Sequence, residues 1–161
     1  MEENSKLREQ LAYHLSGHGA HIDFDTAVEG MPFELTGKQV PKLAHTAWQL
    51  VYHLQMAQSD ILEFSRNPAH VSPEYPSGYW PKAPAPADEE QWQGTIASFR
   101  EDLQAMIALV KNPDSDLFTP FAHGSGQNLL REAILIIDHN SYHIGQLVDI
   151  RMLLGIPVRD W

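Results

Sequence analysis

Four segments of this chain carry apolar residues at steps of three and four, and no segment shows sustained alternation of apolar and polar residues. The first pattern is typical of amphipathic helices, whereas the second would indicate strands. We therefore predict an all-α fold without a substantial sheet. The expected helices cover residues 5–28, 40–65, 88–112 and 127–154. Each would be about 35–40 Å long, and the apolar faces can bury one another in a four-helix bundle.

Glycine and proline mark the expected irregularities and helix starts. Gly17 and Gly19 lower the helix propensity of the first segment, so we expect a kink or a break there. Pro41 suits the first turn of the second helix, because backbone N–H groups in the first turn have no hydrogen-bond partner within the helix and proline has no N–H to leave unpaired. The whole chain, residues 1–161, is expected to form one domain, since 161 residues is a usual domain size.

The segment between the second and third helices, residues 68–87, is rich in proline and aromatic residues. Its six prolines exclude regular helix and strand. A disordered linker carries few aromatic residues, whereas this segment contains Tyr75, Tyr79 and Trp80. We expect an ordered loop whose rings pack back onto the domain and cover a cavity. A loop of this length also permits the second and third helices to lie parallel as neighbours.

Composition narrows the functional classes. The net charge of −10 disfavours a nucleic acid or an anionic membrane surface as partner. No apolar run is long enough to span a bilayer and the N-terminal residues do not resemble a signal peptide, so a cytoplasmic protein is expected. The chain has no cysteine, and therefore any metal site must use histidine and carboxylate ligands. Its nine histidines are about twice the usual share.

Two of these histidines, His139 and His143, are four residues apart in the last predicted helix. That spacing places both on one helix face, so that their imidazoles can converge on one ion. His53 lies on the inward-facing stripe of the second helix and can supply a third ligand. Three histidines with an open fourth position describe a catalytic metal site. Asn140 stands where a zinc protease carries its general-base glutamate, and a di-iron bundle would need more carboxylates, so both of these classes are disfavoured.

A competing cluster lies in segment 5–28, where three histidines follow one another at steps of four and three. These are His14, His18 and His21. Solvated or capping histidines are the simpler interpretation, although His21 is well placed to line a pocket because the chain after it turns apolar. The other three histidines fall near helix ends or in loops, and we interpret them as surface residues: His45, His70 and His123.

Helix geometry also indicates residues that can hold a ligand imidazole through its second nitrogen. The candidates share a face with one of the three ligand histidines: Gln49, Asp60, Glu132 and Gln146. For Asp60 and Glu132 the alternative is a solvated charge on the helix surface, and both interpretations stay open.

Three stretches of the chain carry a shared pattern. The second helix contains Trp48-Gln49-Leu50-x-x-His53-Leu54, the loop contains Gly78-Tyr79-Trp80-Pro81, and the last helix contains Asp138-His139-Asn140-x-Tyr142-His143-x-Gly145-Gln146-Leu147. Taken together they resemble the DinB/YfiT-like superfamily of metal-binding four-helix bundles, and the resemblance covers nearly the whole chain. The second and last helices carry its specific motifs, whereas the first and third helices match by pattern.

The resemblance implies a divalent metal, most often zinc or nickel, held by His53, His139 and His143. It also implies a homodimer. Relatives of known activity include low-molecular-weight-thiol transferases and a thiol-dependent isomerase. Val51-Tyr52 precedes His53 where close relatives tend to have Leu-Glu, so this chain lacks an acidic neighbour at that point.

We therefore predict a divalent-metal-dependent enzyme, foremost a low-molecular-weight-thiol S-transferase that acts on a small electrophilic substrate. Because the chain has no cysteine, the sulfur must come from a small thiol cosubstrate. His21, Tyr142 and Gln146 are the residues expected to position the reactants. The alternatives are a metal-hydroxide hydrolase using the same three histidines, a non-catalytic metal-stabilised bundle or stress-related binding protein, and a metal-free dimer whose aromatic loop binds a partner.

Overall fold

The computed structural model describes residues 2–159, which contain five α-helices, one 3₁₀-helix and no β-strand. The prediction of an all-α fold is confirmed for this part of the chain. In chain order the elements are α1 (Glu2–Leu15), α2 (Phe24–Val28), the 3₁₀-helix η1 (Phe33–Leu35), α3 (Ala47–Arg66), α4 (Glu89–Lys111) and α5 (Leu129–Leu153).

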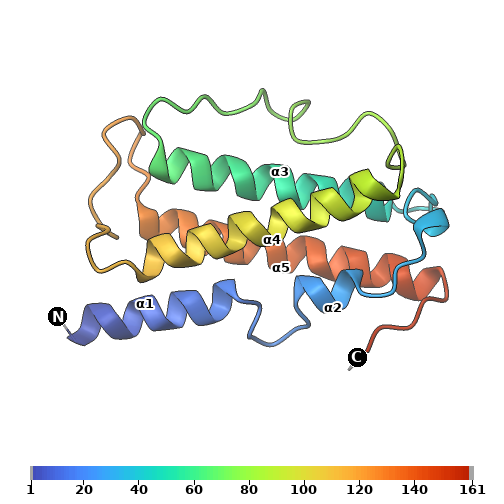
Figure 1. Cartoon of the computed structure of the whole chain (residues 1–161), viewed down its shortest axis with the longest axis horizontal. Coiled ribbons are helices and arrows are strands. Elements are labelled where there is room, and N and C mark those ends of the chain that lie inside the picture. Colours follow the sequence, from blue (N-terminus) through green and yellow to red (C-terminus); the bar gives the residue numbers. More distant parts are fainter. Residues whose placement is uncertain (1, 160–161) are drawn as a thin grey trace.

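The four long helices lie side by side (Figure 1). α3 packs against α4 and α5, α1 packs against the same two helices, and the short α2 packs against α5. α3 and α4 run in the same direction, because the segment that joins them crosses the length of the molecule before α4 begins (Figure 1). The long loop thus does permit a parallel pair of neighbours. α3 and α5 run in opposite directions, which brings the second and last sequence motifs together.

Side-chain caps determine where the long helices begin. Thr46 forms a capping box with Gln49: the Thr46 hydroxyl accepts from the Gln49 N–H at 3.2 Å, and the Gln49 amide oxygen accepts from the Thr46 N–H at 3.0 Å. Asp88 and Asn128 accept in the same way from backbone N–H groups at the starts of α4 and α5. Gln49 is therefore occupied as a cap residue, and the role expected for it beside His53 is wrong.

The break expected at Gly17 and Gly19 is confirmed, and the predicted start of the second long helix is wrong. Residues 5–28 form two helices separated by a turn, because Gly17 adopts a φ of +80° and Asp23 caps the new start at α2. The next long helix begins after its cap, Thr46, and Pro41 lies in a turn ahead of it. A capping box satisfies orphan backbone N–H groups at the helix start, whereas proline only removes one such group, so the cap is the stronger signal.

Buried apolar side chains form two clusters along the helices. The first joins α2, α3 and α5 to the start of α4 and includes Trp48 and Phe99. The second joins α1 to the opposite ends of the long helices and includes Leu62 and Met106. Within residues 2–159, no helix is both long enough and apolar enough to cross a lipid bilayer.

Candidate metal centre

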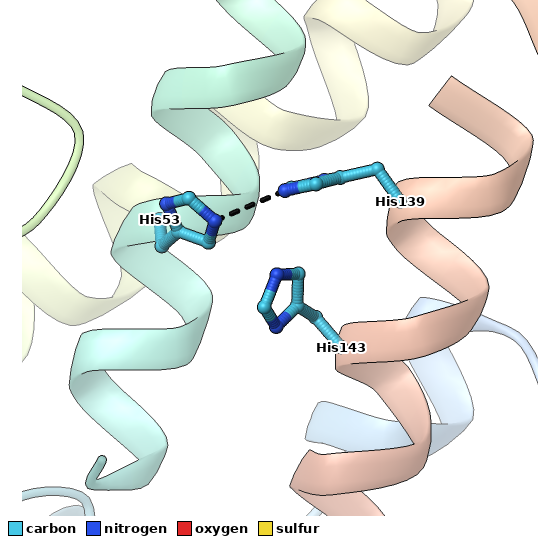
Figure 2. Close-up of side chains that lie close together, drawn as sticks. All are labelled: His53, His139 and His143. Atoms are coloured by element: carbon cyan, nitrogen blue, oxygen red, sulfur yellow. Dashed lines mark hydrogen bonds between the residues drawn. The ribbon is translucent and has the colours of Figure 1, made fainter. Parts of the chain in front are cut away.

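The three histidines selected from the sequence lie together between two neighbouring helices. His53 projects from α3, and His139 and His143 project from α5 toward it (Figure 2). The ring centroids are 4.8, 4.7 and 4.6 Å apart, and one nitrogen from each ring lies within 4.8 Å of the other two. Only 7% of His53 and of His143 is exposed. The group can therefore hold a metal ion.

Hydrogen bonds determine which nitrogen of each ring faces the centre. His53 donates from Nδ1 to the backbone carbonyl of Tyr79 at 3.2 Å, since a carbonyl can only accept. Its Nε2 therefore carries the lone pair. The Nδ1 of His143 lies 2.7 Å from the side-chain oxygen of Gln146 and donates to it, which leaves its Nε2 as a lone pair too. Gln146 thus does hold the imidazole of His143, as its position three residues after His143 predicted.

The third ring is held differently. The Nε2 atoms of His139 and His53 are 3.0 Å apart and hydrogen bonded (Figure 2). Because the Nε2 of His53 is a lone pair, the proton between them belongs to His139. A neutral imidazole has one N–H, so the Nδ1 of His139 is a bare acceptor. That Nδ1 is buried and has no hydrogen-bond partner. An unpaired buried polar atom costs about 1–3 kcal/mol, so this arrangement does not satisfy the ring.

The positions of the histidine nitrogens suit a shared divalent cation better than they suit hydrogen bonds among the three rings. Two nitrogens bound to one tetrahedral zinc ion at 2.0–2.1 Å would be about 3.3 Å apart, close to the observed separation of the His53 and His139 Nε2 atoms. Shared coordination would also let the His139 ring carry its proton on Nδ1 as a donor. The donor set of three imidazoles and no thiolate suits zinc, nickel, iron and cobalt.

Burial keeps the three rings neutral, which is the form that binds metal. Burial, together with the charge that His139 and His143 would carry, lowers the pKa of His53 to about 4. It also lowers the pKa of His139 to about 4, again assisted by His143. The pKa of His143 is lowered by burial as well. At neutral pH the three imidazoles are therefore uncharged.

The Pro- and aromatic-rich segment covers one side of the site. The Trp80 ring stacks on His53 with centroids 3.8 Å apart and an interplanar angle of 7°. His45 stacks on Trp80 as well, at 3.9 Å and 14°. The loop is therefore packed onto the domain, as its aromatic residues predicted. The interpretation of His45 as a plain surface residue is wrong, because its ring belongs to this stack.

Asp60 anchors the same loop to α3. Its Oδ2 accepts from the Tyr79 hydroxyl at 2.8 Å, and its Oδ1 lies 2.7 Å from Nε2 of His70. Burial and the contact with Asp60 raise the pKa of Tyr79 to about 12. Asp60 therefore acts on His53 through Tyr79, whose carbonyl holds the ring, and not by direct contact. His70 is likewise a loop anchor and not a plain surface residue.

The other residues expected at the site lie at different distances from it. Tyr142 is 65% exposed, and its ring meets that of His143 at 4.9 Å. Gln146 lines a cavity of about 60 Å³ together with His45. Glu132 is buried and paired with Arg131, a contact that takes the place of its expected role beside His139.

His21 lies beside a different cavity, of about 110 Å³, at the junction of α1 and α2 with α4 and α5. Its Nδ1 donates to the carbonyl of Ile22 at 2.7 Å, and its Nε2 lies 2.8 Å from the Ser141 hydroxyl. His14 lines the same cavity, while His18 packs on the Tyr13 ring. Among residues 2–159, the His53 group is the set of ligands close enough to share an ion, so the histidines of segment 5–28 form no second one.

Comparisons of the chain with protein families, with curated proteins and with solved structures found no match. The resemblance to the DinB/YfiT-like superfamily therefore stays a prediction that rests on the quoted motifs.

Proposed function

We propose that this protein is a divalent-metal-dependent enzyme that holds zinc or nickel on His53, His139 and His143. The observation that carries the proposal is the pair of Nε2 atoms 3.0 Å apart between α3 and α5, with the opposite nitrogen of His139 buried and unpaired. Both features become favourable when a cation takes the place of the shared proton.

We also propose that the four long helices form a four-helix bundle of the DinB/YfiT-like type. Support comes from the packing of α3 and of α1 against α4 and α5, and from the long crossing loop that places Trp80 on a ligand ring. The same resemblance leads us to propose a homodimer in the cytoplasm. Exposed apolar residues along α5, Ile134 and Met152, support a subunit contact on that helix.

The reaction that we propose is transfer of a small thiol to an electrophilic carbon. A bound divalent cation lowers the pKa of a coordinating thiol, so that a thiolate is present at neutral pH. Three protein ligands leave a position for an exogenous ligand, and the chain has no cysteine to fill it. Such a thiol would release its proton to solvent, and its sulfur would form the new S–C bond as the leaving group departs with its electron pair.

Residues of this chain can place the reactants beside that position. Gln146 holds His143 and also faces the cavity that it shares with His45 and Leu50, which offers apolar surface to a small substrate. Tyr142 presents its exposed ring next to His143. These positions favour Gln146 and Tyr142 over His21 for contact with substrate, because His21 lines the separate cavity.

A second candidate is a structural role for the same ion. The burial of His53 and His143, the roof formed by Trp80, and the link between α3 and α5 favour it. A structural ion would make folding depend on metal, whereas an ion used in catalysis leaves a folded protein after chelation.

The test begins with metal content. Wild-type protein, His139→Ala and the control His18→Ala are purified and their bound metals are measured by elemental analysis. We expect one ion per chain in the wild type and the control and a loss in His139→Ala. Unchanged content in His139→Ala would remove that residue from the site.

The activity is then assayed by mixing metal-loaded protein with a panel of cellular thiols and a chromogenic electrophile. We expect a rate above background that requires both metal and one class of thiol. A protein that binds the ion, reacts with no thiol and unfolds on chelation would instead support the structural role.

A further inference from the structure

A chain of buried amides leads from the backbone of α4 to the ligand helix α5. It begins at Gln58, which is completely buried and donates from Nε2 to the carbonyl of Phe99 at 2.6 Å. A backbone carbonyl can only accept, so this bond fixes which end of the Gln58 amide faces α4. The oxygen of Gln58 must therefore face the other way, toward α5.

That oxygen in turn orients Asn140. The Asn140 Nδ2 donates to the Gln58 oxygen at 2.9 Å, so the Asn140 amide cannot be reversed without losing the bond. Its Oδ1 is consequently the free end. Only 8% of Asn140 is exposed, and its Oδ1 is buried with no hydrogen-bond partner. The chain of amides thus ends in an acceptor that lacks a donor.

The residue before Asn140, His139, carries a second buried atom without a partner, its Nδ1. Both atoms are acceptors while His139 gives its proton to His53 from Nε2, so no hydrogen bond joins them. Asn140 directly follows His139 on α5, and the interaction of its side chain with the ring raises the pKa of His139 against the lowering by burial. An imidazole that coordinates a cation through Nε2 keeps its single proton on Nδ1. In that tautomer the unpaired Nδ1 becomes a donor and meets the unpaired Asn140 oxygen.

We propose that Asn140 is the positioning residue of His139: its Oδ1 accepts from Nδ1–H in the ligand tautomer, and Gln58 and the Phe99 carbonyl hold it in place. This inference rests on the proposed metal site and extends it to a tautomer switch, in which the His139 proton moves from Nε2 to Nδ1 with no change in net charge of the ring. Each ligand then has its own acceptor, the other two being the Tyr79 carbonyl for His53 and Gln146 for His143.

Two variants at the same position separate this role from a merely structural one. Asn140→Asp keeps an acceptor for Nδ1–H, and Asn140→Leu removes it, while both lose the hydrogen bond to Gln58. Zinc dissociation constants are measured by competition with a chromophoric chelator. We expect Asn140→Leu to bind zinc about 10–100-fold more weakly than the wild type and Asn140→Asp to bind at least as tightly as the wild type. Ser141→Asp serves as a control for added negative charge on α5.

The tautomer itself is read by ¹⁵N–¹H correlation spectra of the histidine rings. We expect Nε2–H for His139 in metal-free wild-type protein, and in the zinc-loaded protein a slowly exchanging Nδ1–H signal that is lost in Asn140→Leu. This measurement on the wild type remains decisive even where a variant fails to fold.

The outcomes for the two proposals differ. Wild-type protein that binds no zinc would refute the metal site. Zinc bound by the wild type and by Asn140→Leu with equal affinity, or a His139 Nδ1–H that exchanges with water as fast as in a free imidazole, would overturn the role of Asn140 and leave the metal site standing. Equal weakening in Asn140→Asp and Asn140→Leu would show that the contact with Gln58 matters and not the acceptor, and would also overturn it.

Discussion

Replacing Tyr79 by Phe should loosen the loop that holds His53 without changing any metal ligand. The substitution removes the hydrogen bond from the phenol to Oδ2 of Asp60 at 2.8 Å and the phenol's bond with Ser72, and it leaves the bond between Asp60 and His70 intact. Hydrogen bonds to charged groups contribute about 1.5–3 kcal/mol. Because Tyr79 is only partly buried and Asp60 keeps a second partner, we expect the low end, a loss of about 1.5 kcal/mol. For a chain of this length that corresponds to a fall in Tm of about 3–6 °C.

The assay is urea unfolding followed by tryptophan fluorescence, combined with calorimetry for Tm, on metal-free protein. Tyr75→Phe is the matched control, because that tyrosine is 79% exposed in the same loop and its ring is kept. A second readout is the absorbance titration of tyrosine, in which Tyr79 should contribute a late phase near pH 12 that vanishes in Tyr79→Phe. Equal stability of the two variants, with the late phase still present in Tyr79→Phe, would refute the anchoring of the loop through Asp60.

Three further outcomes are expected. The pKa values of His53 and His139 are both lowered to about 4, so the unfolded chain binds more protons than the folded one between pH 4 and about pH 6.5. Metal-free protein should therefore lose stability as the pH falls through this window. Unfolding midpoints that do not change with pH would contradict this. Free zinc at 100 times its dissociation constant should stabilise the protein by about 2.7 kcal/mol and raise Tm by about 5–11 °C, and chelator should reverse the shift in a thermal scan. Gly17→Ala should lower the free energy of unfolding in urea by at least about 1–2 kcal/mol, because φ is +80° and a Cβ there would lie 2.5 Å from that of Asp23. Gly30→Ala should lower it less, because Gly30 has a φ of +65° but open space around it. The reverse order would argue against the turn between α1 and α2.

Local patterns were sufficient for the all-helical class and for finding the three histidines that lie together. The stripe of α5 and the step of four between His139 and His143 place both rings on one helix face, whatever the rest of the chain does. The inward stripe of α3 likewise indicates that His53 is buried. A periodic pattern describes the faces of a single helix, and both of these properties belong to a single helix.

Contacts across the chain could not be predicted in this way. Asp60 was a candidate because it shares a face with His53, yet its partners, Tyr79 and His70, come from the loop. The stacking of Trp80 on His45 and His53 is not indicated by any periodic spacing of these residues in the sequence. Gly17 and Gly19 did predict the break after α1, whereas the place where the chain becomes helical again depends on the cap at Asp23, which was not predicted.

By itself the sequence determined the all-helical class, the lack of thiolate ligands and the three imidazoles available for an ion, because periodicity and composition are local and additive. The tertiary structure decided which nitrogen of each imidazole faces the centre. In the structure that choice depends on the Tyr79 carbonyl for His53, on the Gln146 oxygen for His143 and on the Nε2 of His53 for His139, and two of these three contacts join segments that are far apart in the chain. The protonation pattern of a buried cluster is thus a property of packing and not of spacing.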